Sequence, residues 1–388
     1  MRFLPVLILV FCLTVGFFSS NQSLKKGQWI KQFHTHSITE SLTKNGYQIL
    51  STTLPCPDTH GNLFRSWAEE PPVFHLLAAF FSQLGIQSPV FLPLFSYTLF
   101  MIATFLLLNN QLSTTKIEKG RQNLLFLLIF TTPALMRFSV QHLPDLLATA
   151  LLVLGGYFTL KKNRVWMHLF LCLAVTTKAL TLFPAVSFLI YSSFFDFQKP
   201  DTKTTLKNCL SLVISIGILV MPFVIWVSLL QYMQISNPFF HEFNIQNRYF
   251  GSLGLLIQLK YWLRMINWSA SKGVGWVLFT AFCSSILYRR GRVWNKNRLE
   301  GLMFIWSFAL LPYWVLVRQG NFVHDHYFLP FLLPISVLGS LTLSKIPSRL
   351  WLSILVFASV TNGILSLTQM KPLGLDNACD QEAPKYFN

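Results

Sequence analysis

The chain has 388 residues, of which 53% are hydrophobic and only 12% are charged. Soluble globular domains carry about 25% charged residues, so this composition excludes an ordinary soluble domain. The formal net charge is +17, but the basic residues lie in short clusters between long apolar runs. That distribution is typical of the cytoplasmic loops of membrane proteins, and we therefore expect no nucleic-acid partner.

Apolar runs along the whole chain predict membrane-spanning helices. Several runs reach the roughly 20 residues that a helix needs to cross a bilayer, and they lack the alternation of barrel strands. We therefore predict an all-α polytopic membrane protein, a single integral-membrane domain over residues 1–388, with about 11 transmembrane helices. The expected spans are residues 3–19, 89–109, 123–141, 145–160, 165–178, 181–196, 208–231, 273–288, 299–317, 327–344 and 350–368.

The orientation of the chain follows from its first span. A cleaved signal peptide is an alternative, but we favour an uncleaved helix because Ser19-Ser20-Asn21 is a weak cleavage site. Arg2 before this helix then places the N-terminus in the cytoplasm, and the loop 20–88 lies outside. The later basic clusters all fall inside in this arrangement. Cys56 and Cys379 fall outside, where a disulfide and two separate thiols are both open.

Two apolar segments in the expected outer loops predict interfacial helices. The segment from Pro72 to Gly85 is short for a membrane span and suits an interfacial or re-entrant helix. The pair Pro71-Pro72 suits the start of a helix, where a missing N–H costs nothing. We expect His75 and Gln83 of this helix to face lipid headgroups, and we expect a second interfacial helix near residues 251–266.

Charged residues at the outer ends of spans are candidates for chemistry, because a charge deep in the bilayer is costly and tends to face protein or a water-filled cavity. Asp145 begins one span, and it is either a first-turn acid favoured by the helix dipole or a functional group. Lys178 ends another, and it either extends to the interface or neutralises a phosphate. Glu69 and Glu70 directly precede the Pro-Pro pair, which favours a functional role.

Two pairs of histidines suggest metal binding as an alternative. In His324-Asp325-His326 an extended backbone would place both imidazoles on one side, and His34 and His36 form a similar pair. Imidazole and carboxylate groups are zinc ligands, but neither pair has a third ligand at a typical spacing. We therefore predict no metal, and we expect these groups to contact substrate hydroxyls or phosphate instead.

Four polar motifs occur in an order that spans most of the chain. They are Trp29 to His36 followed by Asn45 to Leu50, Glu69-Glu70-Pro71-Pro72 continuing to Leu84-Gly85, Leu143 to Leu147 together with Thr177-Lys178, and His324 to Pro330. Each motif is weak by itself, but the ordered set is more specific. The chain thereby resembles the GT-C glycosyltransferases of the dolichyl-phosphate-mannose-protein mannosyltransferase-like class, which includes the bacterial aminoarabinose transferases.

The resemblance implies an inverting glycosyltransferase. A sugar carried on a polyprenyl phosphate would enter from the membrane, and cations would hold its phosphate. A base would activate a hydroxyl of a lipid, glycan or protein acceptor. The implied partners are the polyprenyl-phosphate sugar donor, membrane lipids and this acceptor. The implied location is the bacterial cytoplasmic (inner) membrane with the active face outside. A lipid phosphate is a good leaving group, so no cofactor is required.

The resemblance also assigns site residues, with the loop 20–88 as the probable catalytic region. Relatives often have Arg where Lys31 stands and an acid where His34 stands. The base therefore has three candidates: Glu69, Glu70 and His34. The residues expected to bind the sugar or its phosphate are Lys31, Gln32, Thr35, Arg65, Asp145, Lys178, His324, Asp325, His326 and Tyr327.

The alternative functions are a transporter or flippase without enzymatic activity and a transferase-like scaffold that has lost activity, which the changed first-loop motif would fit. Secondary transporters usually show internal repeats and ionisable residues near the centres of their spans. In this chain the polar groups collect at the ends of the spans instead. That pattern favours chemistry at the membrane surface over transport through it.

Overall fold

The structure is a computed structural model that describes residues 29–49, 53–54, 65–66, 71–86, 88–112, 119–195, 202–233, 250–289, 298–323, 325–346 and 348–368. Several sequence predictions concern residues outside these ranges. They are the first span at 3–19, the acids Glu69 and Glu70, His324, and the cysteines Cys56 and Cys379.

The described residues form helices and one short pair of strands. The α-helices are α2 (Trp29–Lys44), α3 (Val73–Gln83), α4 (Ser88–Leu112), α5 (Lys119–Phe130), α6 (Pro133–Phe138), α7 (Pro144–Leu160), α8 (Arg164–Thr177), α9 (Leu182–Ile190), α10 (Thr202–Tyr232), α12 (Leu259–Asn267), α13 (Trp276–Arg289), α14 (Arg298–Phe308), α15 (Leu310–Leu316), α16 (Arg318–Val323), α17 (Leu329–Leu343) and α18 (Arg349–Thr368). Shorter 3-10 or π-helical segments are η1 (Ala179–Thr181), η2 (Tyr191–Phe195), η4 (Leu253–Leu255), η5 (Trp268–Val274) and η7 (Asp325–Phe328). The strands β1 (Thr53–Leu54) and β2 (Arg65–Ser66) pair antiparallel.

Helix lengths confirm an integral membrane protein. Among the described residues, three helical segments are long and apolar enough to cross a membrane, Phe91–Asn109, Thr205–Tyr232 and Arg298–Leu316. A bent pair adds a fourth span if it is counted as one, and six further apolar helices are shorter. Helix α7, for example, has 17 residues, which is about 25 Å at 1.5 Å per residue. The polytopic helical class is thus confirmed, while the exact number of spans stays a prediction.

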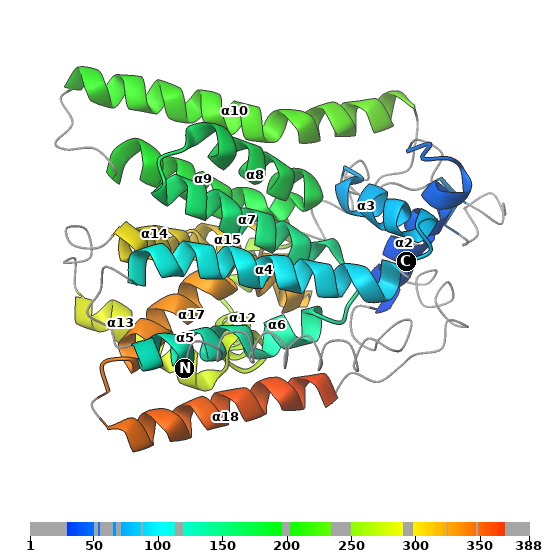
Figure 1. Ribbon diagram of the computed structural model, residues 1–388. Coiled ribbons are helices and arrows are strands. Elements are labelled where there is room, and N and C mark those ends of the chain that lie inside the picture. The colour runs from blue at the N-terminus through cyan, green and yellow to red at the C-terminus, as the bar shows by residue number, and fades with distance from the viewer. Residues whose placement is uncertain are drawn as a thin grey trace.

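The helices are arranged side by side, with α2 and α3 at one end (Figure 1). Helix α10 lies along one edge, packed on α8 and α9, and α18 lies along the opposite edge, packed on α5 and α6. Helices α4, α7 and α17 lie between these edges. The end of the bundle that carries α2 and α3 is called the α2/α3 end below.

Helix α3 covers the α2/α3 end and does not cross the bundle. Its 11 residues extend about 16 Å, well short of the roughly 30 Å of a hydrocarbon core. Ile38 and Leu42 of α2 pack against Ala79 of α3. The expectation that His75 faces headgroups is wrong, because His75 lies on the buried side of α3 with Phe74. This side of α3 packs against the rest of the protein, so it does not face the lipid headgroups.

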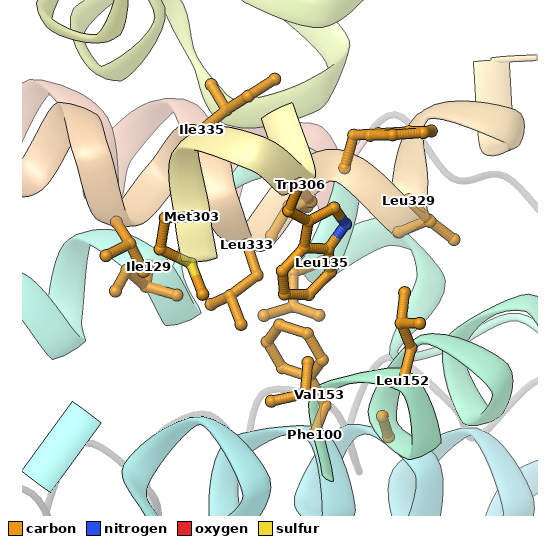
Figure 2. Packing of buried hydrophobic residues seen from close by; sticks show 14 of the residues in the cluster. Phe100, Ile129, Leu135, Leu152, Val153, Met303, Trp306, Leu329, Leu333 and Ile335 are labelled. Atoms are coloured by element: carbon orange, nitrogen blue, oxygen red, sulfur yellow. The ribbon is translucent and has the colours of Figure 1, made fainter. Parts of the chain in front are cut away.

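The core is built from helices far apart in the sequence. The ring of Trp306 on α14 is fully buried and meets Phe188 of α9 edge to face, with 4.6 Å between ring centroids. Its indole N–H donates to the carbonyl of Pro330 at 2.8 Å. Figure 2 shows Phe100 of α4 and Val153 of α7 in the same cluster. This cluster fixes the middle of the bundle and therefore the ends of its helices.

Glycine allows one close helix pair. A Cβ added to Gly339 of α17 would lie 2.5 Å from the carbonyl oxygen of Leu278 in α13. Real Cβ atoms do not approach a backbone oxygen so closely. Helices α13 and α17 pack against each other along their length, and only glycine at this position permits that distance.

Candidate functional site

Two buried charges lie at the α2/α3 end. Helices α7 and α8 are joined by the three residues 161–163 and pack antiparallel. The start of α7 and the end of α8 therefore lie at the same end of the bundle. Asp145 in the first turn of α7 is 4% exposed, and Lys178 directly after α8 is 2% exposed. Of the acidic and lysine side chains that the structure describes, these are the buried ones.

Local sequence explains why each charge is there. Pro144 is the first residue of α7, where its missing N–H costs nothing, and Asp145 follows at the positive end of the helix dipole. Lys178 leaves the helical conformation, with φ −153° and ψ 107°, and ends α8 at the negative end of its dipole. The carbonyl of Lys178 accepts hydrogen bonds from the backbone N–H and the hydroxyl of Thr181, at 3.0 and 2.8 Å.

The burial of Lys178 bears on the alternatives for this residue. A lysine that extends to the membrane interface keeps its ammonium in contact with water or headgroups. The side chain of Lys178 is instead enclosed by protein. This geometry disfavours the interface alternative and agrees better with a cation that meets an anionic group inside the α2/α3 end.

Histidines from three segments meet beside these charges. The ring of His142, which precedes α7 and is 1% exposed, lies 5.2 Å from the ring of Phe74 in α3. It also lies 6.2 Å from the ring of His36 in α2, edge to face. The ring of His75 also lies beside Phe74, with 6.0 Å between ring centroids. Two imidazoles, His75 and His142, thus contact the Phe74 ring, and His36 contacts His142.

Burial favours the neutral form of His36. Burial lowers the pKa of His36 below its ordinary value, while the negative charge of Glu40 opposes this shift and the positive charge of Lys44 adds to it. The Nε2 atom of His36 lies 3.6 Å from a carboxylate oxygen of the exposed Glu40. A neutral imidazole at neutral pH can accept a proton, so His36 has the state that a general base needs.

Besides Asp145 and Lys178, the structure describes the side chains of two more predicted binding residues, Thr35 and Tyr327. Thr35 is buried in α2, one residue before His36. Tyr327 is buried in the core, where its ring lies against Gly320 and its carbonyl accepts a hydrogen bond from the hydroxyl of Tyr313 at 3.0 Å. The structure therefore brings Asp145, Lys178 and Thr35 to the α2/α3 end, and it shows packing contacts for Tyr327.

The other predicted site residues are described only in their backbone or not at all. Their side chains lie outside the described part of the chain, so their roles stay predictions. They are Lys31, Gln32 and His34 in α2, Arg65 in β2, Asp325 and His326 in η7, and Glu69, Glu70 and His324.

One further cation, Arg318, stabilises the backbone. Its Nε and Nη2 atoms donate to the carbonyls of Ser252 and Gly251 at 2.9 and 2.6 Å, and Nη1 donates to Val315 at 3.1 Å. This arrangement ties α16 to the segment before η4. Arg318 is therefore occupied by structural contacts and is a poor candidate for binding phosphate.

The sequence analysis assigned no role to His142, and it considered His36 as a metal or substrate contact but not as a base. The available signal was weak: Gln141 and His142 are consecutive polar residues between two apolar runs, directly before the Leu-Pro-Asp motif. Among the described residues, no group of three or more His, Cys, Asp or Glu side chains is placed to hold a metal ion. The side chains of residues 324 and 326 lie outside the described part of the chain.

Comparison with known proteins finds similarity in structure alone. No family model matches the chain. No curated protein matches its sequence either. The crystal structure of ArnT from Cupriavidus metallidurans bound to undecaprenyl phosphate superposes with a TM-score of 0.59 at 16% identity over 89% of this chain. The same enzyme in the apo state gives a TM-score of 0.57, also at 16% identity over 89% of the chain.

The similarity to ArnT covers only part of the ArnT chains and is low in sequence identity. This chain spans 61% and 60% of the two ArnT chains, and at 16% identity the likeness is one of fold. The all-helical membrane fold that the sequence predicted is thereby confirmed. This protein is an integral membrane protein with the fold of ArnT.

Proposed function

We propose that this protein is a glycosyltransferase that moves a sugar from a polyprenyl-phosphate donor to a hydroxyl acceptor. The observation that carries the proposal is the group of His142, Asp145 and Lys178, buried at one end of a bundle with the ArnT fold, with the partly exposed His36 beside His142. The related ArnT structure holds undecaprenyl phosphate, which supports a lipid phosphate as the carrier here. The acceptor is a hydroxyl of a lipid, a glycan or a protein.

The reaction needs a base and a cation. The base takes the proton of the acceptor hydroxyl, and the hydroxyl oxygen then forms a bond to the anomeric carbon of the sugar. The bond from that carbon to the phosphate oxygen breaks on the opposite face, so the configuration inverts and the polyprenyl phosphate leaves with the electron pair. Lys178 binds the phosphate oxygens and stabilises the charge that grows on them.

Four groups are candidates for the base. Glu69, Glu70 and His34 follow from the family resemblance, and His36 is added because its neutral imidazole lies beside His142. A positioned base contributes roughly 10²–10⁴-fold to such a rate. Asp145, enclosed at the start of α7, supplies a buried carboxylate that favours the charged form of Lys178 at the same end of the bundle.

The finer assignments belong to the same proposal. The mannosyltransferase-like class, the bacterial inner membrane and an active face outside follow from the motifs and from the distribution of basic residues. In that orientation the α2/α3 end faces outward, and no divalent metal is needed for the transfer.

A transfer assay tests the proposal. The full chain is reconstituted in nanodiscs with synthetic polyprenyl-phosphate sugars and candidate acceptors, and the release of polyprenyl phosphate is measured. We expect Glu69→Gln or Glu70→Gln to reduce the rate at least about 100-fold if that residue is the base. Glu300→Gln, an acid in the first turn of α14, is the matched control and should leave the rate unchanged. If no donor supports transfer by the wild-type chain, the transporter alternative is favoured.

A further inference from the structure

A second polar surface lies away from the buried charges, on α12 and η5. An open pocket of about 610 Å³ is lined there by Leu259, Lys260, Leu263, Arg264, Asn267, Trp268 and Lys272. Three of these seven side chains are cations and none is acidic. The predicted catalytic residues do not line it, so the proposed transfer reaction leaves this pocket unexplained.

The cations and the tryptophan form one row. Lys260, Arg264, Trp268 and Lys272 follow one another at intervals of four residues, which places successive members on the same side of a helix. The Arg264 guanidinium lies 4.5 Å from the centroid of the Trp268 ring, and the Lys272 ammonium lies 5.1 Å from it. The indole ring thus holds two of the cations at the pocket by cation–π contacts.

An apolar row runs beside the cations. Leu259 and Leu263 line the same pocket and are 70% and 56% exposed, and Ile266 one turn further is also exposed. The opposite side of α12 is anchored, because Tyr261 is buried and its hydroxyl donates to the carbonyl of Trp314 at 2.6 Å. The helix therefore presents outward both a cationic row and an apolar row. That is the pattern of a helix lying in a membrane interface.

The direction of α12 agrees with such a position. The segment Leu259–Val274 is bent by 117° relative to the apolar segment Trp276–Leu287. The bend occurs at Gly275, whose φ of +89° is rarely adopted by other residues. Because α12 turns sharply away from the apolar helix α13, it does not extend that helix across the bilayer. The prediction of an interfacial helix near 251–266 thus corresponds to α12, several residues further along the chain.

We propose that this pocket binds the headgroup of an anionic phospholipid of the surrounding bilayer. The phosphate meets Lys260, Arg264 and Lys272, and an acyl chain lies along Leu259 and Leu263. A free phosphate ion would gain nothing from the exposed leucines, whereas a phospholipid uses both rows. The bound lipid anchors α12 and η5 at the membrane surface. This role is independent of the proposed transfer reaction.

The anchored segment connects to the candidate site. A guanidinium N–H of Arg137 in α6 donates to the carbonyl of Lys272 at 3.3 Å, and α6 packs on η5. The chain leaves α6 directly toward Gln141, His142 and Asp145. A lipid that fixes η5 therefore also fixes the helix from which these residues extend.

Photo-crosslinking of the full chain tests the site. The protein is reconstituted in phosphatidylcholine nanodiscs with phosphatidylglycerol that carries a diazirine in its headgroup, and labelled residues are located by peptide mass spectrometry. No sugar donor is present, so the result does not depend on catalysis. We expect labels on residues 259–272, and at least about tenfold weaker labelling there in K260Q/R264Q/K272Q. A milder variant, K260Q/K272Q, changes only exposed cations and should weaken the label several-fold.

The control variant K161Q/K162Q/R164Q removes three exposed cations after α7 and at the start of α8. It should leave the 259–272 label within about twofold. Four outcomes would overturn the proposal. They are unchanged labelling in both pocket variants, equal labelling by a phosphatidylcholine probe, displacement by millimolar inorganic phosphate, and displacement by equimolar undecaprenyl phosphate. The last two would assign the pocket to a free anion or to the sugar carrier.

Discussion

Replacing Lys178 by Met tests whether the buried ammonium binds the donor phosphate. Met keeps most of the length of the side chain and removes its charge. Lys178 is 2% exposed, so water does not replace the lost contact. A hydrogen bond to a charged group contributes roughly 1.5–3 kcal/mol. At about 1.4 kcal/mol per factor of ten, the loss in kcat/KM for the polyprenyl-phosphate sugar is roughly 10- to 150-fold.

The assay compares initial rates of polyprenyl-phosphate release in nanodiscs over a range of donor concentrations. Lys207→Met is the matched control, since Lys207 is exposed on α10; it should retain the wild-type kcat/KM. A second comparison separates binding from folding. If Lys178 only balances the charge of Asp145, the double variant K178M/D145N should recover the activity that K178M loses. Wild-type activity in K178M, or recovery in the double variant, would refute the proposed phosphate contact.

The remaining predictions concern stability and the neighbouring groups. Gly339→Ala should lower the free energy of unfolding by about 1–3 kcal/mol, because the added Cβ meets a backbone carbonyl of α13. The control Gly217→Ala, with open space around it, should not destabilise the protein. Equal melting temperatures of the two variants would contradict this prediction. Asp145→Asn should reduce transfer at least about tenfold while Glu300→Gln does not, in the same release assay. Burial lowers the pKa of His36 in the folded protein below its ordinary value of 6.5. As the pH falls below 6.5, the His36 imidazole therefore takes up a proton in the unfolded chain before it does so in the folded protein, and the free energy of unfolding should decrease. His36→Gln should flatten that dependence in thermal unfolding from pH 7 to 5, and an unchanged slope would argue against it.

The sequence was a good guide to where helices begin and end. Pro144 and the apolar run after it predicted a span from residue 145, and α7 begins at Pro144. The Pro72–Gly85 segment predicted a short helix, and α3 covers Val73–Gln83. Such signals are local: proline at a first turn, apolar runs and their length act within one helix. The break of the expected span 123–141 into α5 and α6 at Thr131 and Thr132 was not predicted, although Pro133 at the start of α6 is a signal of the same kind.

Side-chain burial was harder to predict than helix position. His75 looked like a residue at the membrane surface, yet it lies on the buried side of α3. A short amphipathic helix can direct a histidine toward lipid headgroups or toward protein, and its sequence is compatible with both. The packing of Ala79 on Ile38 and Leu42 decides between them.

Local chemistry thus specified the membrane class, most helix boundaries and two of the buried charges, because hydropathy, helix-starting prolines and charge placement act over a few neighbouring residues. Tertiary packing alone decided that His36 of α2 meets His142, more than a hundred residues later, beside Phe74 of α3. It also placed Asp145 and Lys178 at the same end, through the antiparallel contact of α7 with α8. Those contacts depend on how whole helices pack against each other, and no short stretch of sequence contains that information.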